Sequence, residues 1–162
     1  MTAPADLGTT RLADHVAVTE LVSRMLLLVD ARDWHELTSL FTRTVRVDYT
    51  SLWGGEPQAQ TAAELAAGWR QTIGHLDATQ HLAGNHIVTI DGDHATCAAN
   101  VQATHVLANH SGGPTWTVGG RYDLTLDRTT AGWRISGTTL TVRWTAGNQH
   151  ILQLRGNQGG HE

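Results

Sequence analysis

The stretch Asp30-Ala-Arg-Asp-Trp-His-Glu-Leu-Thr-Ser-Leu-Phe41, continued by Val45-Arg-Val-Asp-Tyr-Thr-Ser51, decides the fold of this chain. An apolar helical pattern ends on an acidic residue, a second helix start follows, and an alternating strand then carries a tyrosine among valines. The acid and the tyrosine fall on sides that these patterns predict to be buried. A buried polar group costs free energy unless a partner satisfies it. We therefore expect these side chains to serve a ligand.

Upstream of this stretch the pattern predicts one long helix. Apolar residues recur at spacings of three and four from Leu12 to about Asp30. Residues 1–11 lack this periodicity and are expected to form a flexible tail.

The stretch itself predicts a short helix and a strand. Asp33, followed three residues later by Glu36, has the form of a capping box, so a second helix is expected to run to about Phe41. Residues 44–51 alternate between the two faces of a half-buried strand. The inward face of that strand is expected to carry Val45, Val47 and Tyr49.

Downstream, Thr61-Ala-Ala-Glu64 is a second capping box and predicts a third helix to about Ile73. The sequence then alternates as strands do, and four strands are expected, over residues 79–90, 94–108, 116–127 and 133–145. Helices followed by an antiparallel meander predict an α+β fold with the helices on one face of the sheet. We place one domain at residues 12–146 and a flexible tail at residues 147–162.

The composition is that of a globular protein of ordinary size. The chain has 162 residues, of which 40% are hydrophobic and 16% charged, which suits one domain with a substantial core. A net charge of −4 without a basic run argues against a nucleic-acid partner. The longest apolar run, Met25-Leu-Leu-Leu-Val29, is too short to span a membrane. One cysteine, Cys97, and the lack of a visible signal peptide predict a cytoplasmic location. All 11 basic residues are arginine, which excludes lysine-based chemistry.

Two histidines are candidates for the inner face of the sheet. His105 shares its side of the strand only with small and apolar residues, which leaves room for a helix or a ligand. A three-residue turn at Asp91-Gly-Asp93 would make His81 a diagonal neighbour of His105, whereas a two-residue turn would put the two on opposite faces. A bulge at Gly84-Asn85 would reset the register. The sequence leaves these alternatives open.

Each candidate also has a plain structural explanation. A single buried histidine often only binds a backbone carbonyl, an acid at a helix end such as Asp30 often binds a nearby loop, and inward tyrosines such as Tyr49 and Tyr122 usually fill space. A buried carboxylate is otherwise often a general base or the partner of a histidine. Histidine suits proton transfer near neutral pH. The six tryptophans, Trp53 and Trp116 among them, are compatible with an aromatic-lined pocket or with simple packing.

No metal or cofactor site is expected. The ten histidines and one cysteine form no His-x-His, His-Glu-x-x-His or Cys-x-x-Cys pattern. The glycines follow no phosphate-binding pattern, and no Gly-x-Ser-x-Gly elbow offers a hydrolase nucleophile.

Five short motifs occur in an order and spacing that carry a family resemblance. They are Asp30-Ala-Arg-Asp-Trp34, Val47-Asp-Tyr-Thr-Ser51, Thr79-Gln-His-Leu82, Gly132-Trp-Arg-Ile135 and Val142-Arg-Trp144. Over about residues 12–145 the chain resembles scytalone dehydratase and, more broadly, the SnoaL-like branch of the nuclear-transport-factor-like superfamily. The resemblance implies a cone-shaped, curved antiparallel sheet with three helices in the N-terminal half that enclose a pocket.

The resemblance also implies roles for the acid and the histidines. Asp30 and His105 match an Asp–His pair that handles the abstracted proton and the leaving hydroxyl. His81 matches a second histidine of the pocket.

The tyrosines match the family less closely. Tyr49 matches one of two tyrosines that polarise a substrate carbonyl through water, but Val29 stands where the second is expected. Tyr122 stands at the position of an asparagine that contacts the leaving hydroxyl. We predict catalytic roles for Asp30, His105, His81 and Tyr49, and substrate-binding roles for Tyr122, Val29, Trp53 and Trp116.

The implied function is a cofactor-independent acid–base lyase, a dehydratase or isomerase, acting on a small cyclic or aromatic carbonyl compound in bacterial secondary metabolism. A polyketide cyclase that closes a ring by aldol addition and a non-catalytic small-molecule-binding module are the alternatives. The expected partner is a hydrophobic or aromatic small molecule, with no nucleic acid and no membrane. A homo-oligomer, dimer or trimer, is expected because the outer sheet face keeps apolar residues such as Val106.

Overall fold

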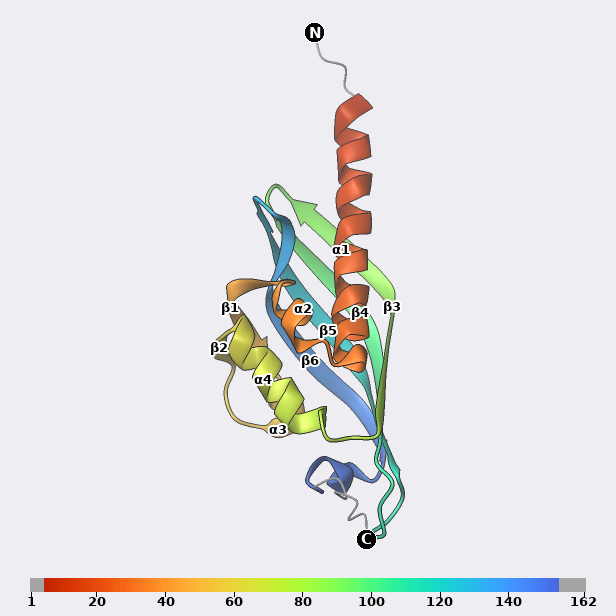
Figure 1. Cartoon of the computed structure of the whole chain (residues 1–162). Coiled ribbons are helices and arrows are strands. Elements are labelled where there is room, and N and C mark those ends of the chain that lie inside the picture. The colour runs from red at the N-terminus through yellow and green to blue at the C-terminus, as the bar shows by residue number, and fades with distance from the viewer. Residues whose placement is uncertain (1–4, 155–162) are drawn as a thin grey trace.

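The structure is a computed structural model that describes residues 5–154, and within this range it contains one six-stranded sheet and five helical segments (Figure 1). The helices are α1 (Ala5–Ala31), α2 (Trp34–Thr38), α3 (Thr50–Trp53), α4 (Ala62–Ile73) and the 3-10 helix η1 (Gln149–Leu152). The strands are β1 (Phe41–Asp48), β2 (Gln58–Thr61), β3 (Ala78–Asp91), β4 (His94–Val106), β5 (Thr115–Thr129) and β6 (Gly132–Gly147). The predicted α+β class is confirmed.

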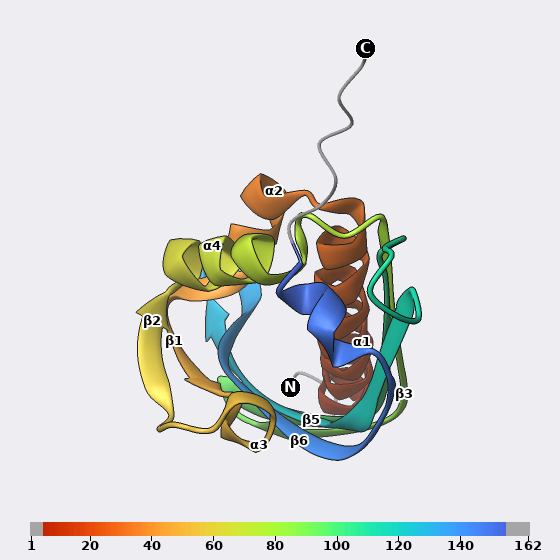
Figure 2. The same cartoon turned by 90° about the horizontal axis from the view of Figure 1, so that it is seen from below.

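The sheet has the order β2-β1-β6-β5-β4-β3, and it curves round the helices to form a cone. Figure 2 shows β5 and β6 bending past α1, with α4 along the opposite side of the opening. The meander of β3, β4, β5 and β6 is antiparallel as predicted. The pairing of β1 with β6 is parallel, which brings the segment that follows α1 beside the C-terminal strand.

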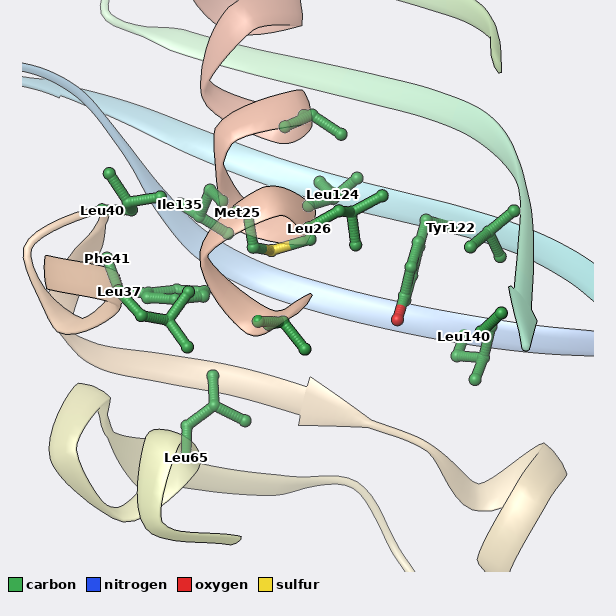
Figure 3. Packing of buried hydrophobic residues seen from close by; sticks show 14 of the residues in the cluster. Met25, Leu26, Leu37, Leu40, Phe41, Leu65, Tyr122, Leu124, Ile135 and Leu140 are labelled. Atoms are coloured by element: carbon green, nitrogen blue, oxygen red, sulfur yellow. The ribbon is translucent and has the colours of Figure 1, made fainter. Parts of the chain in front are cut away.

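The core lies between α1 and the concave face of the sheet. Figure 3 shows Met25 and Leu26 of α1 among buried residues of the sheet such as Leu124 and Ile135. Leu65 of α4 belongs to the same buried cluster. The apolar spacing that predicted the helix therefore supplies the contact that holds the sheet curved.

The helix starts inside the sequence were correctly predicted. The Asp33 side chain accepts a hydrogen bond from the Glu36 amide at 3.0 Å and so caps α2. At α4 the capping box is complete, because Thr61 and Glu64 each bind the other's backbone amide. The second helix ends at Thr38 rather than near residue 41, because Phe41 already begins β1.

Four segments differ from the prediction. Helix α1 begins at Ala5, so residues 5–11 are helical rather than a tail, whereas residues 1–4 lie outside the described range. The short elements α3 and β2 were missed; β2 reads Gln-Ala-Gln-Thr and is formed by backbone pairing to β1, without apolar alternation. Residues 149–152 of the predicted C-terminal tail form η1. Its Ile151 is fully buried, which explains why this segment is ordered.

A bulge in β3 sets the register of the histidine strands. Next to the turn, Asp91 pairs with His94, the register of a two-residue turn, but beyond Gly84 the register shifts by one residue. Asn85 absorbs the extra residue with a left-handed backbone conformation (φ 56°), which asparagine tolerates better than most residues. His81 consequently pairs with Ala103, and the side chains of residues 81 and 105 share the concave face.

A buried ion pair fixes α1 to the β5–β6 hairpin. The Asp14 carboxylate accepts two hydrogen bonds from the Arg128 guanidinium, at 2.9 and 2.8 Å, and one from the Trp133 indole at 3.0 Å. The guanidinium also stacks on the Trp133 ring, 4.3 Å from its centroid.

Helix α1 is long, but it is not apolar enough to cross a bilayer, and neither is any other helix among residues 5–154.

Candidate active site

A cavity opens inside the cone, between α1, α3, α4 and the concave face of the sheet. The space open to the centre of a water molecule is about 80 Å³, which is room for several waters or a small ligand. Most of its wall is apolar. The cavity is lined by Leu26, Val29, Tyr49, Leu52, Trp53, Trp69, Thr72, Ile73, His81, Val101, Ala103, His105, Trp116, Val118, Tyr122, Leu140 and Leu152.

Asp30 and His81 form the most polar feature of this cavity. The Asp30 Oδ1 atom lies 2.7 Å from His81 Nδ1 and accepts a hydrogen bond from the Thr79 hydroxyl at 2.9 Å. Its Oδ2 atom accepts from the His81 amide at 2.8 Å. The side chains of His81 and Asp30 are only 9% and 19% exposed. The carboxylate thus binds both the ring and the backbone of one histidine.

The end of α1 holds Asp30 in place for this contact. The helix stops at Arg32, which has a left-handed backbone (φ 58°), and the Arg32 side chain donates a hydrogen bond to the Leu76 carbonyl next to β3. An acid in the last turn faces the negative end of the helix dipole, which disfavours its charge. Asp30 therefore does not stabilise its own helix, and its hydrogen bonds to β3 account for its position.

Asp30 is ionised at neutral pH. Burial tends to raise the pKa of its carboxyl, but the hydrogen bonds from the His81 ring, the His81 amide and the Thr79 hydroxyl outweigh burial and lower the pKa. A carboxylate only accepts hydrogen bonds, so His81 Nδ1 carries the proton. In the neutral ring, Nε2 then keeps its lone pair. Since His81 lines the cavity, this side chain can act as a base there.

His105 does not make the contact with Asp30 that the sequence analysis expected. Thr79 is paired opposite His105 across the sheet, whereas Asp30 binds His81, two residues further along β3. The His105 Nδ1 atom instead donates a long hydrogen bond, 3.4 Å, to the Trp116 carbonyl. The two imidazoles meet edge to face, with ring centroids 5.7 Å apart.

His105 is buried and neutral at neutral pH. Burial, and secondly the proximity of His81, lower the pKa of His105 from 6.5 to about 4, against smaller opposing effects of the Trp116 carbonyl and Asp30. The ring is 5% exposed. It can offer a neutral hydrogen-bonding nitrogen to a ligand, but it does not carry a positive charge at pH 7.

Two tyrosines form a second polar group in the cavity. The hydroxyls of Tyr49 and Tyr122 lie 3.3 Å apart, and Figure 3 shows Tyr122 reaching from β5 over β6. Burial raises the pKa of both phenols, and for Tyr49 the neighbouring Tyr122 raises it further. Thr138 and Trp69 face the Tyr49 hydroxyl and oppose that rise. Both phenols are therefore protonated donors at neutral pH.

Thr138 adds an unused hydroxyl beside the tyrosines. Its Oγ1 atom is buried and has no hydrogen-bond partner of acceptable geometry among residues 5–154. One of the two phenol protons serves the contact between the tyrosines. The other phenol proton is left for a bound oxygen atom, which makes the tyrosine pair an acceptor-binding site, whereas Thr138 is not among the residues that line the cavity.

The remaining predicted residues also line the cavity. Val29 and Trp116 are buried, and Trp53 is 52% exposed at the rim. Two further lining residues were not predicted from the sequence: Trp69, which stacks on Tyr49 with centroids 6.4 Å apart, and Leu152 of η1. Thr79 was not predicted as a partner of Asp30 either. The helical spacing of Trp69 from Leu65 pointed to a core position for Trp69, but nothing local pointed to Leu152.

The described residues that line the cavity include no arginine. Within residues 5–154, no three His, Cys, Asp or Glu side chains come together in a way that could hold a metal ion. Asp30 is not among the lining residues and reaches the cavity only through its hydrogen bond to His81. A ligand with its own negative charge finds no cation here to compensate it.

Several solved structures are similar to this chain. A protein from Kribbella flavida, Kfla4162, is 31% identical with a TM-score of 0.84, and the match covers 89% of this chain and 99% of that one. A candidate scytalone dehydratase from Novosphingobium aromaticivorans is 18% identical, with a TM-score of 0.72 and coverages of 87% and 91%. A hexachlorocyclohexane dehydrochlorinase, LinA-type3 from Novosphingobium barchaimii, is 16% identical, with a TM-score of 0.70 and coverages of 85% and 92%.

The curved six-stranded sheet and the cavity inside it define an α+β cone fold, and the likeness to these structures confirms the fold predicted from the sequence motifs. The family of the SnoaL-like domain matches residues 10–152, and the chain belongs to this family. No curated protein matches the sequence.

Proposed function

We propose that this protein is a cofactor-independent acid–base lyase that acts on a small, uncharged ring compound with a carbonyl or similar acceptor oxygen. The observation that carries the proposal is the hydrogen bond of the ionised Asp30 to His81 Nδ1, at 2.7 Å, which leaves the other ring nitrogen as a base in an apolar cavity. The similarity to a candidate scytalone dehydratase and to a dehydrochlorinase supports the reaction class.

The proposed base is His81 rather than His105. His81 Nε2 would take a proton from a carbon next to the substrate carbonyl, and Asp30 would stabilise the imidazolium that forms. The electron pair left by that proton moves onto the carbonyl oxygen, where the hydroxyls of Tyr49 and Tyr122 would donate to the enolate. The enolate then re-forms the carbonyl, and its electron pair makes a carbon–carbon double bond that expels the hydroxyl from the next carbon. This hydroxyl takes the proton from the imidazolium and leaves as water.

His105 would position the leaving group in this scheme. Its ring lies edge to face with His81 and is neutral, so it can bind a hydroxyl without competing for the proton. Tyr49 and Tyr122 would hold the other end of the substrate. The apolar wall between these polar groups includes Trp116, whose ring is tilted by 33° against His105 with centroids 5.0 Å apart, and suits a flat ring.

The absence of an arginine from the described lining supports an uncharged substrate. A carboxylate or phosphate would lose its hydration in this cavity without gaining an ion pair. A role in bacterial secondary metabolism, a cytoplasmic location and an oligomeric assembly stay predictions from the sequence.

Two alternatives use the same cavity. A polyketide cyclase would use His81 to deprotonate a carbon between two carbonyls and then close a ring, which keeps the substrate mass, whereas dehydration loses one water. A non-catalytic binding module is favoured if Asp30 and His105 make no hydrogen bond with each other and side chains fill the cavity. The first condition holds, because Asp30 binds His81 and His105 binds the Trp116 carbonyl. The second does not, because the cavity is open, and the Asp30–His81 pair supports the catalytic alternatives.

The experiment compares two histidine–carboxylate pairs of the same geometry. His94 Nδ1 lies 2.7 Å from Asp127 Oδ1, as His81 does from Asp30, but the His94 pair is on the surface. A panel of hydroxylated cyclic ketones is incubated with the protein, with His81→Gln and with His94→Gln, and product masses are recorded. We expect loss of 18 Da only with active protein, no product with His81→Gln, and full activity with His94→Gln. Unchanged turnover in His81→Gln would refute the proposal.

A further inference from the structure

The chain does not leave the domain after β6 but turns back across the open end of the cone. The turn occurs at Gly147, whose backbone is left-handed (φ 90°). A Cβ atom there would collide with the Thr115 carbonyl, so only glycine fits. The next amide, that of Asn148, donates to the Thr115 carbonyl at 2.9 Å.

A few hydrogen bonds hold residues 148–151 against the rest of the domain. Asn148 Oδ1 accepts from the His150 amide at 3.1 Å and caps η1, and Asn148 Nδ2 donates to the Gly113 carbonyl at 3.0 Å. On the other side, His75 Nε2 donates to the Ile151 carbonyl at 3.1 Å. Ile151 is fully buried beneath these contacts.

Helix η1 forms one side of the opening of the cavity. Leu152 lines the cavity together with Trp53 of α3 and Thr72 of α4, and all three keep some exposure to solvent. Figure 2 shows η1 between α4 and α1 across the end of the cone. A ligand that enters by this end must pass Leu152.

We propose that residues 148–154 form a cover of the cavity that moves about Gly147 as a hinge. The Leu152 side chain limits the size of the ligand that fits beneath the closed cover. The strands are held by long ladders of backbone pairs, whereas this segment is held by the hydrogen bond of His75, by two hydrogen bonds of Asn148, and by packing of Ile151, Leu152 and Leu154 on the core. Segments with so few anchors open at a small fraction of the free energy of global unfolding. The inference rests on the cavity being the binding site proposed above, but not on its chemistry.

The test measures entry and exit of a neutral aromatic probe. 2-Naphthol is mixed with the protein in a stopped-flow instrument, and the fluorescence of the cavity tryptophans is followed. His75→Ala and Asn148→Ala each remove an anchor of the closed segment. We expect the association and dissociation rate constants to rise together by about fivefold, the effect of one lost hydrogen bond or cap on the closed population, while Kd stays within about twofold.

Leu152→Ala tests the size limit, with the exposed Gln153→Ala as its control. We expect Leu152→Ala to accelerate dissociation of 2-naphthol by about tenfold, since the lost side chain contacts the ligand, and to admit larger aromatic probes. Gln153→Ala should behave as the parent protein.

Unchanged association rate constants in both His75→Ala and Asn148→Ala would refute the proposed cover. The absence of a fluorescence change when 2-naphthol is mixed with the parent protein would refute it as well. The readout separates this inference from the proposed function, because binding of 2-naphthol is followed by fluorescence and requires no turnover.

Discussion

His81 and Asp30 are separated by 51 residues in the chain, yet their side chains meet at 2.7 Å, and the His81 amide binds the same carboxylate at 2.8 Å. Binding both ring and amide fixes the position and the tautomer of the imidazole at once. A carboxylate that only filled the end of a helix would need neither contact.

Asp30→Asn should lower kcat on a substrate identified by the mass assay by about 10²–10⁴-fold, because the imidazolium loses its counter-charge and Nδ1 loses a strong acceptor. Asp33→Asn is the matched control. It keeps the cap of α2, since asparagine caps as well as aspartate, and should keep full activity. Circular dichroism of both variants checks that the fold is intact. Equal activity of the two variants would contradict the role of Asp30.

His105 should make the protein less stable in weak acid. Its pKa is lowered from 6.5 to about 4 in the folded state, so between these pH values the unfolded chain binds a proton that the folded protein does not. Stability attributable to this group is therefore complete above pH 6.5 and falls with decreasing pH until about pH 4, by about 3 kcal/mol in all.

The measurement for His105 is urea unfolding at pH 7 and pH 5 of the parent protein and of His105→Gln. The other histidines contribute equally to both proteins, so the difference in their pH dependence isolates residue 105. We expect the variant to lose less stability than the parent protein on acidification. An identical loss in both would show that His105 titrates normally in the folded state.

Thr138→Val should leave the free energy of unfolding unchanged or raise it by about 1 kcal/mol, because the Thr138 hydroxyl is buried without a partner among the described residues. Thr104→Val, on the other face of the sheet, removes a hydroxyl that lies 3.3 Å from the Thr117 hydroxyl and should lower stability by up to about 1 kcal/mol. Urea unfolding of both variants gives the comparison. A clear loss of stability in Thr138→Val would show that its hydroxyl makes a favourable contact in the folded protein.

Asp14→Ala should destabilise the fold by about 2 kcal/mol, because it leaves the Arg128 guanidinium and the Trp133 indole without their acceptor. The ion pairs of Asp14 also hold its pKa below the usual range, with the hydrogen bonds from Arg128 as the main cause. Asp127→Ala removes an exposed partner of His94 and should cost less than about 1 kcal/mol. Chemical unfolding of the two variants gives the comparison, and similar values would show that the buried pair contributes little.

The elements that were predicted correctly are those whose formation depends on residues close together in the sequence. The spacing from Leu12 to Asp30 gave α1, and Thr61 with Glu64 gave α4, since period and capping are properties of neighbouring residues. β2 and η1 were missed because one depends on backbone pairing with β1 and the other on burial of Ile151.

The candidate site was predicted as a set of residues but not as a set of contacts. Asp30, His81 and His105 all reach the cone, yet the partner of Asp30 is His81, because register along β3 decides which histidine meets the helix end. Similarly, Tyr122 was predicted to face inward and to bind substrate, but its contact with the Tyr49 hydroxyl, 73 residues away in the chain, is not a property of the local sequence.

The single extra residue near Asn85 has a wider meaning for this chain. Without it, the turn register would continue along β3, His81 would pair with Thr104, and its imidazole would point to the convex side, away from the hollow. Deletion of this residue would thus remove the contact between His81 and Asp30 while the six-stranded cone kept all its strands. One inserted residue in a strand decides, in this fold, whether a histidine faces the cavity or the convex surface.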